Sequence, residues 1–190
     1  MKSILISIKP EWVAKILNGE KTIEIRKTAP KCELPIDVYI YCTKDSKRAW
    51  YFDKQWRGCY SMSIYDDNAA YEYAMGLKPL NGKVVAKFKL RFVDKIYSYD
   101  TDKLDTELGS SLEELSFESC VPEKDLLSYV GNGAFYWAIS NLEIFDEPKE
   151  LDEFDYLNPS GTRYVSKRSI NGLPSKKHPP QSWCYVEDKA

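Results

Sequence analysis

The hydrophobic period of the chain changes twice within its first 26 residues, and this limits the possible folds more than any other feature. Residues 3–8 form a short apolar run that predicts a strand. Pro10 suits the first position of a helix, and Asn18-Gly19 is typical of a helix end. Between them, apolar residues recur at helical spacing: Trp12, Val13, Ile16 and Leu17. Residues 21–26 then alternate polar and apolar side chains, so the chain is expected to begin as a strand, a helix and a strand.

The remainder of the chain contains more strand patterns than helix patterns. Three β-rich runs are visible, at residues 36–42, 81–93 and 134–144. Two helical patterns lie at residues 112–115 and 122–130. Beyond Pro148 the composition predicts mostly loop, and no internal repeat is visible. We therefore predict an α+β fold, a small mixed β-barrel with one helix near its start and further flanking helices.

The regular patterns break down between residues 44 and 80. This stretch is rich in aromatic side chains that follow no clean period: Trp50, Tyr51, Phe52, Trp56, Tyr60, Tyr65, Tyr71 and Tyr73. We interpret it as an insertion with some helix that packs on the main body through its rings.

Composition excludes several classes of protein. Lys and Arg number 27 and Asp and Glu number 29, so the net charge is −2 at pH 7. Bulk positive charge therefore cannot hold this chain on nucleic acid, and such binding needs a local patch. No apolar run approaches the roughly 20 residues of a membrane helix, and the N-terminus carries too many charges for a signal peptide. We expect a soluble, cytoplasmic protein with no membrane partner.

Cysteine and histidine usage limits metal and nucleophile chemistry. The five cysteines contain no CxxC pair, which is poor spacing for a disulfide framework or for structural zinc. The single histidine, His178, lies beside two prolines in a basic tail, whereas a general base must be held rigidly. The carboxylates also lack the dense cluster that binds a hard cation. We expect no metal and no cofactor.

The most informative stretch for chemistry is Gly19-Glu20-Lys21-Thr22-Ile23-Glu24-Ile25-Arg26. Thr22, Glu24 and Arg26 share one face of the predicted strand, and Lys21 stands at its start. A lysine, a carboxylate and an arginine that converge at a barrel mouth can grip a phosphate or the polar edge of a base. Alternatively, Glu24 and Arg26 form a solvated surface pair worth under ~1 kcal/mol. Spacing alone favours this second interpretation.

These residues resemble the Gly-x-Lys-x-x-Glu-x-Arg signature of the ASCH domain family, whose β-barrel is similar to PUA RNA-binding domains. The flanking order also resembles the family, with Ile8-Lys9-Pro10 before the helix and residues 135–142 as a closing strand. The resemblance covers roughly residues 3–154, which predicts a domain over 1–154 with the 44–80 insertion and a C-terminal extension over 155–190. The ending at residues 179–186 resembles ASCH proteins carried by prophages and mobile elements of Gram-positive bacteria.

The resemblance implies a cleft between the helix and the barrel that takes RNA or a nucleotide. On this basis Gly19 provides the backbone turn, Lys21 and Arg26 contact an anion, and Glu24 accepts a hydrogen bond from a base edge. The match of the motif to its expected context favours this functional site over the solvated pair. The oligomeric state stays open.

A small bacterial branch of the family resembles an amidohydrolase that acts on N4-acetylcytidine through a Lys, a Thr and a Glu. Lys21 matches the Lys, Glu24 stands at the position of the Thr, and Glu118 is the nearest match to the Glu, with Glu114 as a fallback. The enzyme hypothesis is therefore a metal-independent hydrolase, either an amidohydrolase on an acylated pyrimidine nucleoside or a ribonuclease, with Lys21, Glu24 and Glu118 as catalytic residues. An acidic residue before a helix also commonly stabilises the N-terminus of that helix, and this is the structural alternative for Glu118.

Aromatic and basic residues outside the signature offer further candidates. Trp12 shares a helix face with Ile16, which favours a core position. Trp50 and Trp56 follow no period and are the better candidates for stacking on bases, with packing as the alternative. The basic tail is either a solvated loop or an arm that follows phosphates; it comprises Arg163, Lys167, Arg168, Lys176 and Lys177. A third hypothesis is a protein-interaction module of a mobile element that uses the aromatic insertion.

Overall fold

The structure is a computed structural model that describes residues 1–53, 58–100, 103–163 and 178–189. In this part of the chain, one eight-stranded sheet and a separate two-stranded hairpin accompany four α-helices. The strands are β1 (Lys2–Ile8), β2 (Ile23–Arg26), β3 (Ile36–Cys42), β4 (Arg48–Asp53), β5 (Gly58–Ser63), β6 (Val84–Asp100), β7 (Lys103–Thr106), β8 (Ala134–Lys149), β9 (Phe154–Leu157) and β10 (Trp183–Asp188). The helices are α1 (Pro10–Leu17), α2 (Asp67–Ala74), α3 (Leu112–Ser119) and α4 (Glu123–Val130), with a 3₁₀ turn at Leu151–Glu153.

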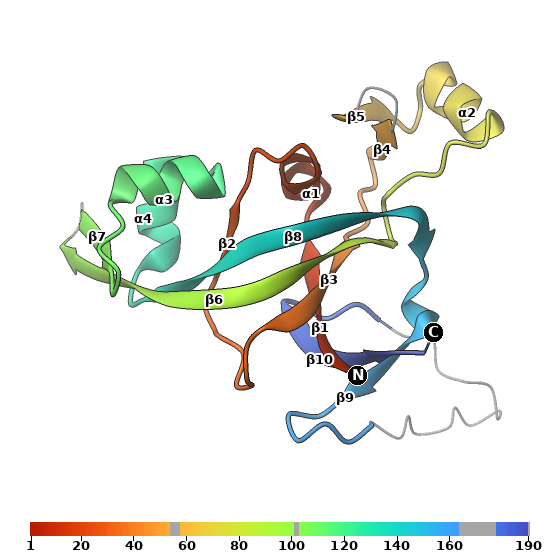
Figure 1. Ribbon diagram of the computed structural model, residues 1–190. Helices are drawn as coiled ribbons and strands as arrows, with labels where there is room; N and C mark the ends of the chain where they lie inside the picture. The colour runs from red at the N-terminus through yellow and green to blue at the C-terminus, as the bar shows by residue number, and fades with distance from the viewer. Residues whose placement is uncertain (54–57, 101–102, 164–177, 190) are drawn as a thin grey trace.

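The strand order of the large sheet is β2-β8-β6-β3-β1-β10-β9, and β7 pairs with β6 off this path. β1 and β3 run parallel, and the other pairs of this sheet are antiparallel. The predicted α+β class is confirmed, and the fold agrees with a PUA-like architecture. In the described residues no pairing joins β2 to β9, so the sheet is not closed into a barrel. Figure 1 shows the long β6 and β8 strands crossing the molecule, with α3 and α4 at one end and α1 above their middle.

The predicted order of strand, helix and strand at the N-terminus is confirmed. Pro10 stands at the first turn of α1, where a missing N–H costs no hydrogen bond. The helix ends at Leu17 with Asn18 as its C-cap, and Gly19 adopts φ of +77°, a backbone conformation that glycine takes without a Cβ clash. The chain then enters β2, which pairs antiparallel with β8.

The sequence predicts mostly loop beyond Pro148, and it misses two strands that form there, β9 and β10. β10 pairs antiparallel with β1 and with β9, so it lies inside the large sheet. Tyr185 and Val186 on β10 are both buried, in different hydrophobic clusters on the two faces of the sheet. Burial on both faces removes the polar–apolar alternation by which a short strand is recognised in a sequence. The predicted extension thus contributes an internal strand of the sheet, while the boundary at residue 154 stays a prediction.

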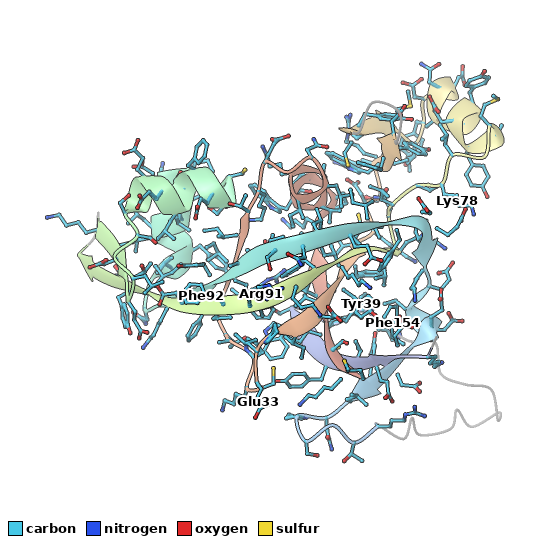
Figure 2. All side chains as sticks on the ribbon, viewed as in Figure 1. Glu33, Tyr39, Lys78, Arg91, Phe92 and Phe154 are labelled. Atoms are coloured by element: carbon cyan, nitrogen blue, oxygen red, sulfur yellow. The ribbon has the colours of Figure 1, made fainter. Side chains whose placement is uncertain are left out.

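Three hydrophobic clusters hold the sheet and helices together. The largest joins α1 to β1, β3 and β6, with Trp137 of β8 fully buried in it. The second lies under α3 and α4, where Leu115 and Leu126 meet the ends of β2, β6 and β8. The third covers the opposite face of β1 and β3. Figure 2 labels two of its rings, Tyr39 and Phe154, whose centroids are 4.9 Å apart in an edge-to-face arrangement.

The aromatic segment between residues 44 and 80 contains the β4–β5 hairpin and α2. The hairpin contacts α1, and the rings of Tyr51 and Tyr60 stack across it at 5.5 Å. Only Ala69 of α2 is buried. Figure 1 shows this unit beyond α1, on the side away from α3 and α4.

Candidate functional site

A cleft of about 760 Å³ lies where α1, the start of β2 and α4 face one another. The ends of β1 and β3 contribute to its walls, and residues 179–181 close one side. Hydrogen bonds hold this C-terminal segment in place, because Ser7 Oγ donates to the Pro180 carbonyl (2.6 Å) and Ser7 N donates to the Ser182 carbonyl (2.9 Å). The walls of this cleft therefore come from segments that lie far apart in the sequence.

Lys21, Glu24 and Arg26 lie together in this cleft, where Glu24 forms an ion pair with each of the two cations. Lys21 Nζ is 3.2 Å from Glu24 Oε2, and Arg26 Nε is 3.0 Å from Glu24 Oε1. Their side chains are only 3%, 10% and 13% exposed, respectively. The Glu24–Arg26 contact is therefore a buried ion pair, and the alternative of a solvated surface pair does not describe it.

The alternation of β2 explains this placement. Ile23 and Ile25 face the cluster under α3 and α4, so Glu24 and Arg26 face the other way, as the sequence pattern predicts. Lys21 enters the cleft because Thr22 N donates to the Glu118 carbonyl (2.9 Å), which ties the start of the strand to the end of α3. The ammonium then donates to the Ser119 carbonyl (2.8 Å). Thr22 itself is exposed and does not line the cleft.

Arg26 is held by groups on two other segments. Its Nη2 donates to the Ser7 carbonyl at 2.8 Å, and its Nη1 lies 3.4 Å from Ser182 Oγ. Its Nε is buried and has no hydrogen-bond partner, because the close contact with Glu24 does not have hydrogen-bond geometry. A guanidinium has five N–H donors, so the Nη atoms of Arg26 retain N–H groups beyond these two contacts.

The comparison with protein family models shows to which family this chain belongs. The family model described as ASCH domain matches residues 6–125, which is more than half of the chain. This chain belongs to the ASCH domain family. A comparison with curated proteins gave no match.

Solved structures agree on the fold of this ASCH domain. It is similar to the crystal structure of ASCH from Zymomonas mobilis, with 17% identity, a TM-score of 0.53, and coverage of 97% of this chain and 87% of the other. The crystal structure of a ZmASCH mutant protein from the same organism gives 16% identity and a TM-score of 0.52, with 100% and 93% covered. At these identities the likeness shows the fold alone. Nothing in the comparisons supports the expected resemblance to prophage proteins.

The structure separates Gly19 and Glu118 from the ASCH cleft. Gly19 is exposed, and its positive φ provides the predicted turn without lining the cleft. Glu118 contributes only its carbonyl to the start of β2, while its side chain lines a second depression of about 500 Å³ with Glu113, Glu114 and Phe117. Of the three residues of the enzyme hypothesis, Lys21 and Glu24 therefore lie together in the cleft, and Glu118 does not line it with them.

The other aromatic and basic candidates also lie elsewhere. Trp50 is on β4, half-buried against the largest hydrophobic cluster, and does not line the ASCH cleft. Arg163 pairs with Glu187 at 2.8 Å and with Asp155 at 3.4 Å. Trp56 and the other four cations of the predicted basic tail lie outside the described residues: Lys167, Arg168, Lys176 and Lys177.

Two aromatic side chains of the cleft were not proposed as site residues from the sequence. Trp12 packs against the core, as its spacing predicts, and also lines the cleft, with its ring centroid 5.6 Å from Lys21 Nζ. Tyr129 of α4 is 43% exposed at the cleft. Burial raises the pKa of its hydroxyl; Arg26 opposes this shift, and Glu24 adds to it. The sequence pattern of α4 did not indicate that Tyr129 lines a cleft, because the position of Tyr129 in the cleft depends on which elements α4 faces in the tertiary structure.

The described residues contain no group of three or more His, Cys, Asp or Glu side chains placed to hold a metal ion. Within the same part of the chain, no helix is long and apolar enough to cross a membrane.

Proposed function

We propose that this ASCH domain binds RNA or a nucleotide in the cleft lined by Lys21, Glu24 and Arg26. The observation that carries the proposal is the buried, continuous Lys21–Glu24–Arg26 array inside a hollow of about 760 Å³. This volume lies within the range of about 300–1,000 Å³ that small-molecule sites occupy. Burying three charges without a ligand role is costly, and such clusters mark functional sites more often than ordinary surface pairs do.

The charges that line the cleft favour an anionic ligand. Lys9, Lys21 and Arg26 are positive, whereas Glu24 and Asp125 are negative, so the lining carries one net positive charge although the chain is acidic. Lys9 is exposed at the mouth, directly before α1. An exposed lysine at the edge of a cleft is suited to a phosphate, because it gains a counterion without losing its own hydration beforehand.

The hydrolase hypothesis receives less support from the geometry. A lysine that acts as a nucleophile or base needs a free amine, whereas Lys21 Nζ donates to the Ser119 carbonyl and pairs with Glu24. Glu118, the expected third residue, directs its side chain into another depression. We therefore propose binding and assign no catalytic step to these residues.

The protein-interaction hypothesis has one observation in its favour. Large apolar side chains are exposed on and beside α2: Ile64, Tyr65, Tyr71, Tyr73, Met75 and Leu77. Exposed apolar patches of this kind mark interaction sites. A variant with Tyr71→Ser and Tyr73→Ser tests whether this surface is separate from the cleft, since RNA affinity is then expected to be unchanged.

The binding proposal is tested by fluorescence anisotropy with a labelled single-stranded RNA decamer at several salt concentrations. We expect affinity to fall as salt rises, and we expect Lys9→Ala to reduce the slope of log affinity against log salt by roughly 0.7. The control is Lys47→Ala, which removes the same charge from an exposed lysine that does not line the cleft. Binding that is independent of salt, or equal loss in both variants, would overturn the proposal.

A further inference from the structure

We propose, building on nucleic-acid binding in this cleft, that the Lys21–Glu24–Arg26 array recognises the imide edge of uracil or thymine. Glu24 accepts a hydrogen bond from the base N3–H, and Lys21 and Arg26 donate to the two carbonyl oxygens on either side of it. This assignment differs from the one implied by family resemblance, in which Lys21 and Arg26 contact an anion.

The first support is the order of the groups. The acceptor, Glu24, stands between two donors, with Lys21 Nζ at 3.2 Å from one carboxylate oxygen and Arg26 Nε at 3.0 Å from the other. The array therefore offers donor, acceptor and donor in sequence. A base edge that complements it must offer acceptor, donor and acceptor.

The second support is the hydrogen-bonding capacity that these groups retain. An ammonium has three N–H donors, and the known contacts of Lys21 Nζ are the Ser119 carbonyl and Glu24. A guanidinium has five, of which Arg26 uses one at Nη2 for the Ser7 carbonyl and one at Nη1 for Ser182 Oγ, so each Nη retains a second N–H. A carboxylate has about four lone-pair positions, and Glu24 has one ion-pair contact at each oxygen. Each member can thus form one further hydrogen bond.

Burial favours a base over a phosphate at this position. The three side chains are 3–13% exposed, and a phosphate placed among them would bring its charge against the Glu24 carboxylate. A neutral base edge meets no such repulsion and satisfies donors and acceptor together. The exposed Lys9, at the mouth of the cleft, is then the residue that contacts a phosphate of the ligand.

Only one kind of base edge complements the whole array. The Watson–Crick edge of uracil and thymine presents carbonyl, N3–H and carbonyl. Cytosine presents an amino group, a ring nitrogen acceptor and a carbonyl, so its amino group meets a cation and its N3 meets Glu24. Adenine likewise places its amino group against a cation and its N1 acceptor against Glu24. Guanine matches the array with O6 and N1–H, but its 2-amino group meets the second cation. Each well-formed pair of contacts discriminates by about 10- to 100-fold.

The aromatic side chains of the cleft supply flat surfaces for such a base. Trp12 of α1 lies beside the array, with its ring centroid 5.6 Å from Lys21 Nζ, and Tyr129 of α4 lines the same hollow. A base stacked on either ring can direct its edge at Glu24. Stacking on aromatic rings is tolerant of base identity, so the selectivity comes from the charged array.

The experiment measures dissociation constants of the whole protein, at low salt, for pentamers of uridylate, cytidylate, adenylate and thymidylate. We expect the uridylate or thymidylate pentamer, or both, to bind at least 10-fold more tightly than the cytidylate and adenylate pentamers. The comparison of uridylate with thymidylate distinguishes an RNA ligand from a DNA ligand. A pentamer of 3-methyluridylate, which lacks N3–H, is expected to lose the preference, while 5-methyluridylate keeps it.

A matched variant tests the role of the acceptor. Glu24→Gln keeps the shape of the side chain but offers both an acceptor and a donor, so the preference for uridylate over cytidylate is expected to fall below about threefold. Lys9→Ala is expected to weaken all pentamers alike. If Glu24→Gln does not fold, the methylated pentamers test the same contact in the unmodified protein.

The outcomes distinguish the two proposals. Equal affinity for uridylate and cytidylate, or tight binding of 3-methyluridylate, would overturn base recognition and leave nucleic-acid binding in the cleft intact. No binding of any pentamer, together with no binding of the longer RNA, would overturn both.

Discussion

Replacement of Glu24 by alanine is expected to destabilise the folded protein strongly, whatever the ligand. The carboxylate lies between two cations whose side chains are 3% and 13% exposed. Its removal leaves Lys21 with the Ser119 carbonyl and Arg26 with the Ser7 carbonyl, and neither contact neutralises a charge. The two cations then share a site that water reaches poorly.

The magnitude follows from burial. Removing one partner of a buried ion pair costs about 3–5 kcal/mol, since an uncompensated charge stays behind. For a chain of this size, each kcal/mol lowers the melting temperature by about 2–4 °C, so Glu24→Ala is expected to lower it by about 6–20 °C. The matched control is Glu143→Ala, which removes a carboxylate 3.1 Å from Lys87 in a pair whose side chains are 59% and 31% exposed. There we expect a loss of at most about 1 kcal/mol.

Urea unfolding followed by circular dichroism and tryptophan fluorescence measures both variants against the unmodified protein. Glu24→Gln, which keeps the side-chain volume, separates the loss of charge from the loss of packing and is expected to be destabilised in the same direction. If Glu24→Ala were as stable as Glu143→Ala, the buried array would contribute nothing to the fold, and the physical basis assigned to the cleft would be refuted.

Three further predictions concern a turn, two thiols and catalysis. Gly19→Ala is expected to cost about 1–2 kcal/mol in urea unfolding, because the backbone has φ of +77° although an added Cβ would meet no atom within 4 Å. Burial raises the pKa of Cys59 and of Cys184 to about 12, so iodoacetamide at pH 8 is expected to label both on the order of a thousandfold more slowly than free cysteine, by mass spectrometry. Incubation with N4-acetylcytidine is expected to release no cytidine, and release abolished by Lys21→Met would contradict this.

Local patterns predicted the first 26 residues well. A proline at the start of α1, apolar residues on one helix face, and Asn18-Gly19 at its end are signals that act within a few residues. The same holds for α4, which begins directly after Pro122 as the sequence indicates. The β9 and β10 strands were missed because they depend on pairing with β1 and with each other. In β10, burial on both faces also removes the alternation that would mark a strand in the sequence.

Local patterns also placed Glu24 and Arg26 on one face of a strand, but they gave no information on whether that face meets water. That outcome depends on α4 and on residues 179–181, which are about a hundred residues or more away and form the other walls of the cleft. Tyr129 and Ser182 take part in the cleft for the same reason. Glu118 is a different case, since its carbonyl accepts a hydrogen bond from Thr22 N at the start of β2, while the residue lines the second depression and not the cleft.

The sequence by itself determined which chemical groups this protein can bring to a ligand: a lysine, a glutamate and an arginine at strand spacing, with no histidine nearby. Their spacing follows from the two-residue repeat of a strand, which is a property of the local backbone. Only the tertiary structure decided that these groups are buried, linked by ion pairs at 3.2 and 3.0 Å, and flanked by aromatic rings. Burial and charge neutralisation arise from contacts between distant segments, and those contacts exist only once the whole sheet and its helices have packed.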